Sequence, residues 1–366
     1  MNDSCPPKPK PRWYHLTPDR LFIGLLAVQV FVLLSERFQW FAFNEHKGWS
    51  ILIAIGVVGV AVVVMLVWLA VTLLLRRRFQ FSFRSLLVFV VTVSMLLGWF
   101  AMEMQKAGKQ REAVEAIVGM GRHVYYDFQI DEAGFEITGA QSTAPVWLRK
   151  SLGDDFFSDV VAADLYGTTD AGLEHVKALT GLEVLYLGDT QVTDVGLEHL
   201  RELTGLRYLR LRGTKVTDAG LEDLKGLTSL QRLSLSNTRV TDAGLQHLKG
   251  LTSLQRLGLN DTLMTDAGLE HLTGLTQLEW LDISGIQLTD AGLEHLKKLT
   301  SLKTLYLGGT RVTPKVSRNS KWRCRTVRFA ASLATPTNRI RSRLVDWWSG
   351  GGLSSNEKNT RRGAIA

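Results

Sequence analysis

A fixed pattern of apolar and polar positions repeats through the middle of the chain. The aspartate of the motif TDAGL or TDVGL recurs every 24 residues, at Asp170, Asp194, Asp218, Asp242, Asp266 and Asp290. The first part of each unit, such as LRYLRLRGT, alternates apolar and polar residues around Leu209 and Leu211, which predicts a short strand. The second part, such as DAGLEDLKGL, has leucines at positions i and i+3, the spacing of one helical face. Each unit therefore predicts a strand followed by a helix.

Stacking explains why the unit is repeated. One strand and one helix cannot bury their leucines alone, whereas stacked units cover each other's apolar edges. The units resemble the leucine-rich repeat family, whose pattern is L-x-x-L-x-L-x-x-N/C-x-L. With Thr214 and Thr238 at the Asn/Cys position and a helix-forming second half, the units look most like the cysteine-containing, ribonuclease-inhibitor-like branch. The resemblance covers residues 160–313 and implies an α/β solenoid, a horseshoe with a parallel concave sheet and outer helices.

The repeated aspartate has a structural interpretation. An aspartate at a strand-to-helix junction can accept hydrogen bonds from the free N–H groups of the helix start, so we expect it to cap its own helix. A calcium or catalytic site would need further carboxylates beside each aspartate, and the unit does not supply them.

Three departures from the pattern stand out. The first repeat lacks two residues between Thr168 and Thr169, so its turn is expected to be shorter. Ile286 replaces the turn threonine, which removes a hydroxyl from any ladder of side-chain hydrogen bonds there. The pattern stops at Pro314, so we expect no seventh helix.

Apolar runs dominate the first hundred residues. Residues 50–75 contain no charged residue in 26 positions. At a rise of ~1.5 Å per residue, a helix of this length crosses a hydrocarbon core of ~30 Å. With two further runs, the sequence predicts an α-helical transmembrane region at 21–102, with spans at 21–43, 49–75 and 85–102. The first run could instead lie in the interface as an amphipathic anchor.

The charges flanking these runs predict a topology. Arg84 and the three arginines at 76–78 lie between the second and third runs, and the positive-inside rule places them in the cytoplasm. Residues 1–20 are then cytoplasmic, and the repeats lie outside the cytoplasm; if the first run does not cross, only the N-terminus changes side. The combination also resembles bacterial membrane-anchored leucine-rich repeat proteins, which implies a bacterial inner-membrane protein.

Residues 103–159 link the apolar runs to the repeats. Mixed charged and apolar residues at 103–121 predict a helix that ends at Gly119 and Gly121. The alternating segment HVYYDFQI predicts a strand in an N-terminal cap at 122–159. We expect Trp147, Phe156 and Phe157 to cover the exposed edge of the first repeat.

The positive charge of the chain is concentrated at its C-terminus, and its cysteines are few. The net charge is +8, and residues 314–366 contribute +10 from 12 Lys or Arg against two acids. Such a segment could contact nucleic acid or anionic lipid. Its polar composition without apolar periodicity is more typical of disorder, so we expect a disordered tail and no nucleic-acid partner. Cys5 and Cys324 are the two cysteines, too few for a disulfide framework or a zinc site.

Signatures of catalysis are absent from the sequence. It contains no Gly-rich phosphate loop, H-E-x-x-H, G-x-S-x-G or kinase signature set, so we expect no enzyme, cofactor or metal. Histidines recur on the predicted outer helices, with Asp223 interrupting the column. Because helical metal ligands need i and i+4 spacing, we expect a solvated surface. The column comprises His175, His199, His247, His271 and His295.

The candidate site is the concave face of the predicted sheet. Strand residues that point away from the buried leucines share this face, and they are rich in Tyr, Trp and Arg, the residues enriched at binding hot spots. The candidates are Tyr186, Tyr208, Arg210, Arg212, Arg232, Arg256, Trp280, Asp282 and Tyr306.

Their composition suggests an acidic protein or glycan partner. The sequence thus favours a non-catalytic, membrane-anchored repeat protein that binds through this face. Three alternatives stay open: a membrane signalling protein that transmits binding inward, an intracellular adaptor resembling the F-box relatives of this repeat branch, and an exposed sheet whose polar side chains only keep it soluble.

Overall fold

The structure is a computed structural model of the 366-residue chain. It describes residues 83–130, 144–313 and 326–328, with single positions at 53, 56, 59, 137, 140 and 142. The predicted N-terminal segment 1–20, the span 21–43 and nearly all of the span 49–75 lie outside the described residues. The chain divides into two compact units: one joins the residues up to Ala107 to Ala144–Phe157, and the other joins Gly108–Thr143 to the residues from Ser158 onward.

The first unit is organised by helix α3 (Phe83–Gly119). A short helix α4 (Val146–Leu152) and a 3-10 helix η3 (Asp154–Phe156) belong to the same unit as the part of α3 up to Ala107. Their apolar side chains form one cluster, made of Ala107, Ala144, Phe156 and Phe157 with Trp99, Phe100, Met104, Leu148 and Leu152 packed against it.

Helix α3 joins two predicted elements into one. It contains the predicted span 85–102 and most of the predicted helix 103–121, and it ends at Gly119 as the sequence indicated. Among the residues that the structure describes, no helix is both long and apolar enough to cross a membrane. The segment 85–102 is thus helical as predicted, and its assignment as a membrane span is not supported.

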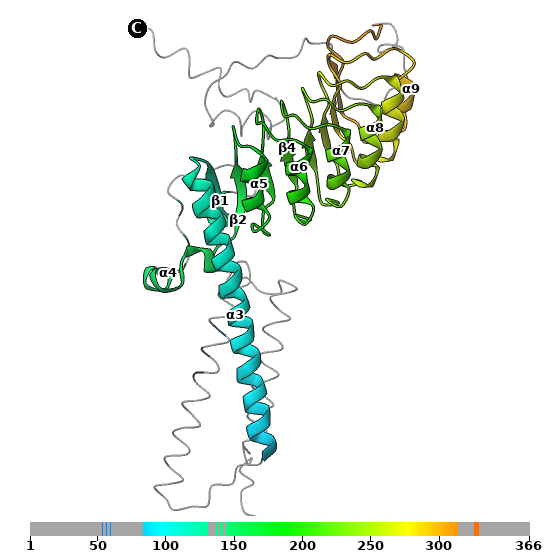
Figure 1. Ribbon diagram of the computed structural model, residues 1–366. Coiled ribbons are helices and arrows are strands. Elements are labelled where there is room, and N and C mark those ends of the chain that lie inside the picture. Colours follow the sequence, from blue (N-terminus) through cyan, green and yellow to red (C-terminus); the bar gives the residue numbers. More distant parts are fainter. Residues whose placement is uncertain are drawn as a thin grey trace, which may run out of the picture. The chain divides into compact units, whose positions relative to one another are not determined.

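The second unit is a repeat solenoid with a nine-stranded sheet on one side and short helices on the other (Figure 1). The first pair of strands is antiparallel and every later pair is parallel, in sequence order. The strands are β1 (His123–Tyr126), β2 (Val160–Asp164), β3 (Val184–Tyr186), β4 (Tyr208–Arg210), β5 (Arg232–Ser234), β6 (Arg256–Gly258), β7 (Trp280–Asp282), β8 (Thr304–Tyr306) and β9 (Thr326–Arg328).

Each strand from β2 to β7 is followed by a short α-helix, a 3-10 helix or both. The α-helices are α5 (Asp170–Val176), α6 (Asp194–Leu197), α7 (Asp218–Leu221), α8 (Asp242–Leu245) and α9 (Leu293–Leu296). The 3-10 helices are η2 (Asp127–Gln129), which follows β1, then η4 (Glu198–Leu200), η5 (Glu222–Leu224), η6 (Gln246–Gly250) and η7 (Asp266–Gly274). The predicted α/β solenoid is therefore confirmed for the repeats.

The leucines form one continuous core. The middle residue of each parallel strand from β3 to β8 is a leucine that is at most 2% exposed, and register pairs each with the next, as Leu209 with Leu233. The helical leucines, such as Leu221 and Leu224, are fully buried in the same cluster. Apolar burial of this kind is the main stabilising contribution to a solenoid.

The repeated aspartate does not cap its own helix. The N-cap is the preceding threonine, as at Thr241, whose hydroxyl accepts from the Ala243 N–H. From Asp170 to Asp266 the aspartate is the first helical residue, whereas the helix after Asp290 begins only at Leu293. Each of these aspartates accepts two hydrogen bonds from the next repeat. Its Oδ1 takes the threonine backbone N–H at 2.7–2.8 Å and its Oδ2 takes the hydroxyl at 2.5–2.8 Å.

These contacts, the Asp–Thr bridges, link six successive pairs: Asp170–Thr193, Asp194–Thr217, Asp218–Thr241, Asp242–Thr265, Asp266–Thr289 and Asp290–Thr313. They also explain the glycine of the motif. A Cβ on Gly220 would lie 2.5 Å from Asp194 Oδ1, and Gly196 meets Asp170 Oδ1 at the same 2.5 Å. The motif thus supplies the carboxylate and the space that it occupies.

The turn after each strand has two fixed features. From Thr190 onward its threonine hydroxyl donates to the carbonyl three residues earlier, as Thr214 does to Leu211 at 2.7 Å, whereas Thr168 donates to the next residue, Thr169. These hydroxyls act within one repeat and form no ladder. Ile286, at the same position, is 3% exposed and belongs to the core. The preceding residue has a left-handed φ of 55–72°, at Asp189, Gly213, Asn237, Asp261, Gly285 and Gly309, which are residue types that tolerate it.

The two ends of the solenoid differ from the prediction. Ala113 and Ile117 of α3 belong to the leucine core and cover the first repeat. Phe156 and Phe157 belong to the cluster of the first unit instead, and Trp147 is 68% exposed, so the expectation for these aromatics is wrong.

At the other end, Thr326–Arg328 forms β9 and pairs in parallel with β8, placing Val327 beside Leu305. A parallel edge offers free N–H and C=O groups with which the backbone of a further strand can pair. The expectation of disorder from residue 314 onward is therefore wrong at these three residues.

Candidate binding face of the sheet

The strand register places the candidate residues, except Arg212, which follows the end of β4, in two rows on the side of the sheet opposite the core leucines. We call this side the sheet face; it is the side that the sequence predicts to be concave. One row runs through Val184, Tyr208, Arg232, Arg256, Trp280 and Thr304, and the other through Tyr186, Arg210, Ser234, Gly258, Asp282 and Tyr306. Neighbouring strands lie ~4.8 Å apart, so adjacent members of a row are side by side.

Two of the predicted residues are buried. Tyr186 and Tyr208 are 9% and 1% exposed, and their rings meet edge to face with centroids 5.1 Å apart. They form a cluster with Ala162 and Val184, against which Tyr125 packs. Burial raises the pKa of both phenols above the ordinary range. These tyrosines pack the N-terminal part of the sheet face, so they are not available to contact a partner.

Two arginines lie side by side in the middle of the first row. Arg232 on β5 is in register with Arg256 on β6, and both are partly buried. Burial lowers the pKa of both guanidinium groups, and the charge of Arg256 lowers the pKa of Arg232 further. An arginine stays protonated at neutral pH even so. The strands therefore hold two like charges next to each other.

Arg210 and Arg212 extend this basic region towards the N-terminal repeats. Arg210 Nε is buried and has no hydrogen-bond partner among the described residues. Gly188 makes room for this side chain, since a Cβ there would lie 3.2 Å from Arg210 Nε. A buried N–H without an acceptor is unfavourable, so an anion reaching this side chain would gain a donor already in place.

An aromatic pair and an acid follow on the C-terminal side. The rings of Trp280 and Tyr306 are 5.4 Å apart at their centroids and tilted by 53°. Asp282 lies in the row of Tyr306, and its Oδ1 accepts the Ser284 N–H at 3.0 Å. Burial raises the pKa of Asp282, while the bonds from Ser284 and the charge of Arg212 oppose that shift. The basic stretch is thus bounded by a carboxylate.

Small residues separate these groups and were not singled out from the sequence. Ser234 and Gly258 stand between Arg210 and Asp282 in the second row. A Cβ on Gly258 would lie 3.0 Å from Ser236 Oγ, so the sheet carries no side chain at this position. They occupy the same position of the 24-residue repeat as Arg210, and this position could have identified them from the sequence.

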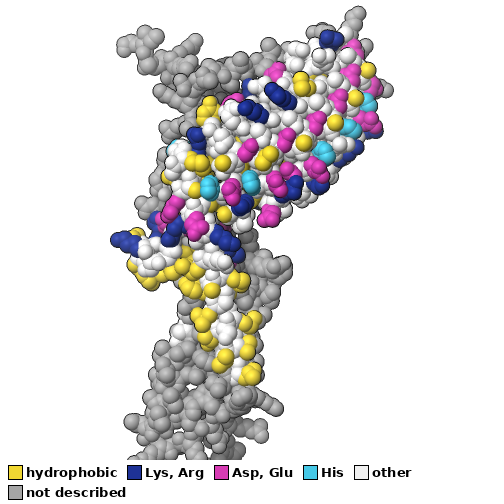
Figure 2. Space-filling model, in the orientation of Figure 1, with side chains coloured by type: hydrophobic (Ala, Val, Ile, Leu, Met, Phe, Trp, Pro, Cys, Tyr) yellow, Lys and Arg dark blue, Asp and Glu magenta, His cyan; other side chains and the backbone are white. Residues whose placement is uncertain are grey.

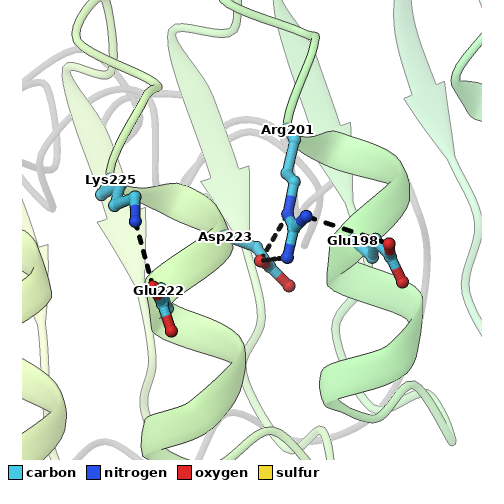
Figure 3. Close-up of polar contacts among 5 residues, drawn as sticks. All are labelled: Glu198, Arg201, Glu222, Asp223 and Lys225. Carbon is cyan, nitrogen blue, oxygen red and sulfur yellow. Dashed lines mark hydrogen bonds and ion pairs between the residues drawn. The ribbon is translucent and has the colours of Figure 1, made fainter.

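The helix side has a different character. Figure 2 shows histidines in a column among acidic and basic side chains over the outer helices. Asp223, which interrupts this column, accepts a hydrogen bond from Arg201 Nε at 2.6 Å (Figure 3). That bond raises the pKa of Arg201, and the bond from Lys225 lowers the pKa of Glu222. Within the described residues, no three His, Cys, Asp or Glu side chains are grouped as metal ligands.

A protein-family model agrees with the repeat architecture. The family model described as leucine-rich repeat region matches residues 166–325, ending directly before β9. No curated protein matches the chain. Among solved structures, internalin C2 from Listeria monocytogenes is 25% identical, and the match covers 50% of this chain and 88% of that one with a TM-score of 0.38.

Proposed function

The chain is a leucine-rich repeat protein, and we propose that it acts by binding another protein through the sheet face, without catalysis. The observation that carries this proposal is the pair Arg232 and Arg256, held side by side on adjacent strands with Trp280 next in the row. Rigid strands fix these side chains before binding, which lowers the ordering cost of association. Trp and Arg are also the residues enriched among binding hot spots.

The charges favour a short acidic segment as the part of the partner that is recognised. Guanidinium groups bind carboxylates through two parallel hydrogen bonds. A long polyanion such as nucleic acid would have to pass Asp282, which lies on the same face two strands beyond Arg232. A glycan is the second candidate, because the flat rings of Trp280 and Tyr306 next to a carboxylate also suit a sugar ring.

Site-specific photo-crosslinking tests this proposal. A benzoylphenylalanine replaces Thr304, which neighbours Trp280 on β8 but is not one of the proposed contacts. The control carries the same group at Val195, which is 66% exposed on α6. We expect a crosslinked product in cells from Thr304 only, which protease digests if the partner is a protein. Products from Val195 alone, or from neither position, would contradict binding through the sheet face.

We also propose that a membrane anchors the chain and that the repeats lie outside the cytoplasm. The support comes from the uncharged sequence at 50–75 and from apolar side chains of α3 that stay 44–62% exposed. Exposed apolar side chains gathered on one helix are unfavourable in water and suit contact with lipid. The exposed side chains are Leu87, Val90, Val91, Met95, Leu97 and Met102.

Protease protection in intact spheroplasts tests this topology. An epitope placed after residue 313 reports the side of the membrane on which the repeats lie. We expect external protease to remove the epitope, because residues 76–78 and Arg84 favour the cytoplasm for their loop. Protection until lysis would contradict this topology and favour an intracellular adaptor. A stable cytoplasmic partner of the N-terminus would favour the signalling alternative.

A further inference from the structure

Helix α4 presents two unlike faces. Leu148 and Leu152, one helical turn apart, pack against the aromatic cluster of the first unit. Val146 and Trp147 point the other way and are 63% and 68% exposed. A tryptophan has the largest apolar surface of any side chain, so exposing one beside a valine is unfavourable in water. The face formed by Val146 and Trp147 is therefore better suited to contact with an apolar partner than with bulk water.

The composition of the exposed face is that of a membrane interface. Lys150 is exposed and lies one turn after Val146, so the face combines an indole, an aliphatic side chain and an ammonium group. Trp and Lys are favoured where hydrocarbon meets water, since each places an apolar body in lipid and a polar end in water. Arg149 is paired with Asp154 and does not contribute a free charge.

The position of α4 along α3 agrees with this composition. Its partly buried leucines, Leu148 and Leu152, pack in the cluster that contains Trp99, Phe100 and Met104 of α3. These three residues lie where the apolar part of α3 ends, since the ion pair of Glu103 with Lys106 follows at 2.7 Å. In Figure 2, hydrophobic side chains run along α3 and continue beside α4. The cluster therefore places α4 at the end of the exposed apolar stretch of α3.

We propose that α4 is an interfacial foot, a short helix that lies on the bilayer surface with Val146 and Trp147 inserted among the lipid headgroups. This inference rests on the membrane anchoring proposed above and adds a specific contact to it. By holding α4 against both lipid and the aromatic cluster, the foot would fix the depth at which α3 leaves the membrane. The structural feature that points to lipid, and not to another protein, is that α4 packs against α3 where the exposed apolar side chains of α3 end, at Met102.

Depth-dependent fluorescence quenching tests the foot in the full chain. Cys5→Ser and Cys324→Ser remove the native thiols, and Trp147→Cys adds one for an environment-sensitive NBD label. Because Trp147 is exposed, its replacement should leave folding unchanged. The control is Val195→Cys, also exposed but on the solenoid. Both proteins are reconstituted into vesicles of phosphatidylethanolamine and phosphatidylglycerol that carry nitroxide-labelled lipids.

We expect the label at 147 to emit at shorter wavelength and to be quenched more by headgroup nitroxides than by mid-chain nitroxides, with no quenching at 195. Emission that is shifted but not quenched would mean that protein, and not lipid, covers α4. Emission that is not shifted would mean that the label at 147 is in water. Either result overturns the foot. Equal quenching at 195 would also overturn it, because lipid contact would not be specific to α4. If the chain is vesicle-bound in these cases, the anchoring stands. If the chain is extracted by alkaline carbonate, both the anchoring and the foot fail.

Discussion

The Asp–Thr bridges and the sheet face are built from the same 24-residue unit, yet one hardly changes along the solenoid and the other changes at almost every repeat. The bridges use the same aspartate and threonine from Asp170 to Thr313, and the same glycine from Gly196 to Gly292. On the sheet face, Tyr208, Arg232 and Trp280 occupy one row. The constant residues contact the next repeat, whereas the varied residues point away from the core. The difference teaches which positions build the solenoid and which are free to select a partner.

The largest effect should come from crowding a bridge. Gly220→Ala would place a Cβ 2.5 Å from Asp194 Oδ1, so the carboxylate must leave its bonds to Thr217. We expect the free energy of unfolding to fall by about 3 kcal/mol, measured by denaturant titration. The matched control is Gly226→Ala, where the nearest atom lies 4.0 Å from the added Cβ and a change within about 0.5 kcal/mol is expected. Equal losses at both glycines would contradict this role of the bridge.

Removing a bridge should cost somewhat less than crowding it. Asp194→Ala deletes the acceptor of the Thr217 N–H and hydroxyl, bonded at 2.7 and 2.6 Å, and we expect a loss of about 2 kcal/mol in unfolding free energy. A double-mutant cycle sharpens the test. Once Asp194 is alanine, Gly220→Ala no longer meets a carboxylate and should cost much less. Additive losses would show that the two residues act independently.

A smaller, pH-dependent effect is expected on the sheet face. The pKa of Asp282 is raised in the folded protein, so the folded state binds this proton more tightly than the unfolded state does. The stability that Asp282 contributes is therefore present at low pH and lost as pH rises through its folded pKa. Asp282→Asn keeps the acceptor for the Ser284 N–H without the charge. We expect thermal unfolding to show that the variant is modestly more stable than the unchanged protein at pH 7 and that this gain disappears in acid. A variant that is less stable at pH 7 would contradict the raised pKa of Asp282.

The smallest effect is expected on the helix side. Arg201 bonds Asp223 at 2.6 Å and approaches Glu198 at 3.9 Å, but its side chain is 58% exposed (Figure 3). Ion pairs in water are screened and restrict two long side chains, so they add little stability. We expect Arg201→Ala to leave the unfolding midpoint unchanged within error, at both low and high salt. A clear loss that salt abolishes would show that this side also holds the repeats together.

The sequence correctly predicted the position of residues that are determined by the 24-residue period and by the alternation of apolar and polar residues. Alternation around Leu209 predicted the strand, and the fixed 24-residue interval predicted that Arg232 and Arg256 would be neighbours on one face, which the register confirms. It assigned the Asp194 carboxylate to its own helix, because local and inter-repeat partners are equally compatible with the same motif. Only the spatial offset between repeats decides that Thr217 is the partner.

Other misjudgements have the same physical origin. Tyr208 has the pattern of an exposed strand residue, but its burial depends on neighbours such as Tyr186 and Tyr125 from other strands. The strand at Thr326–Arg328 is too short to be found by periodicity and is defined by the edge of β8. Packing partners that are distant in sequence were thus the information that the pattern lacked.

Charge reversal on the sheet face tests the separation between building and binding most directly. The double variant Arg232→Glu with Arg256→Glu is compared with Lys215→Glu with Arg239→Glu, two exposed loop residues at the same 24-residue spacing. Each variant carries the crosslinker at Thr304, and both the yield of crosslinked product and the unfolding midpoint are measured. We predict that the sheet-face variant loses the product while keeping its midpoint within a few degrees, and that the loop variant keeps both. Retention of the product by the sheet-face variant would contradict binding through this face.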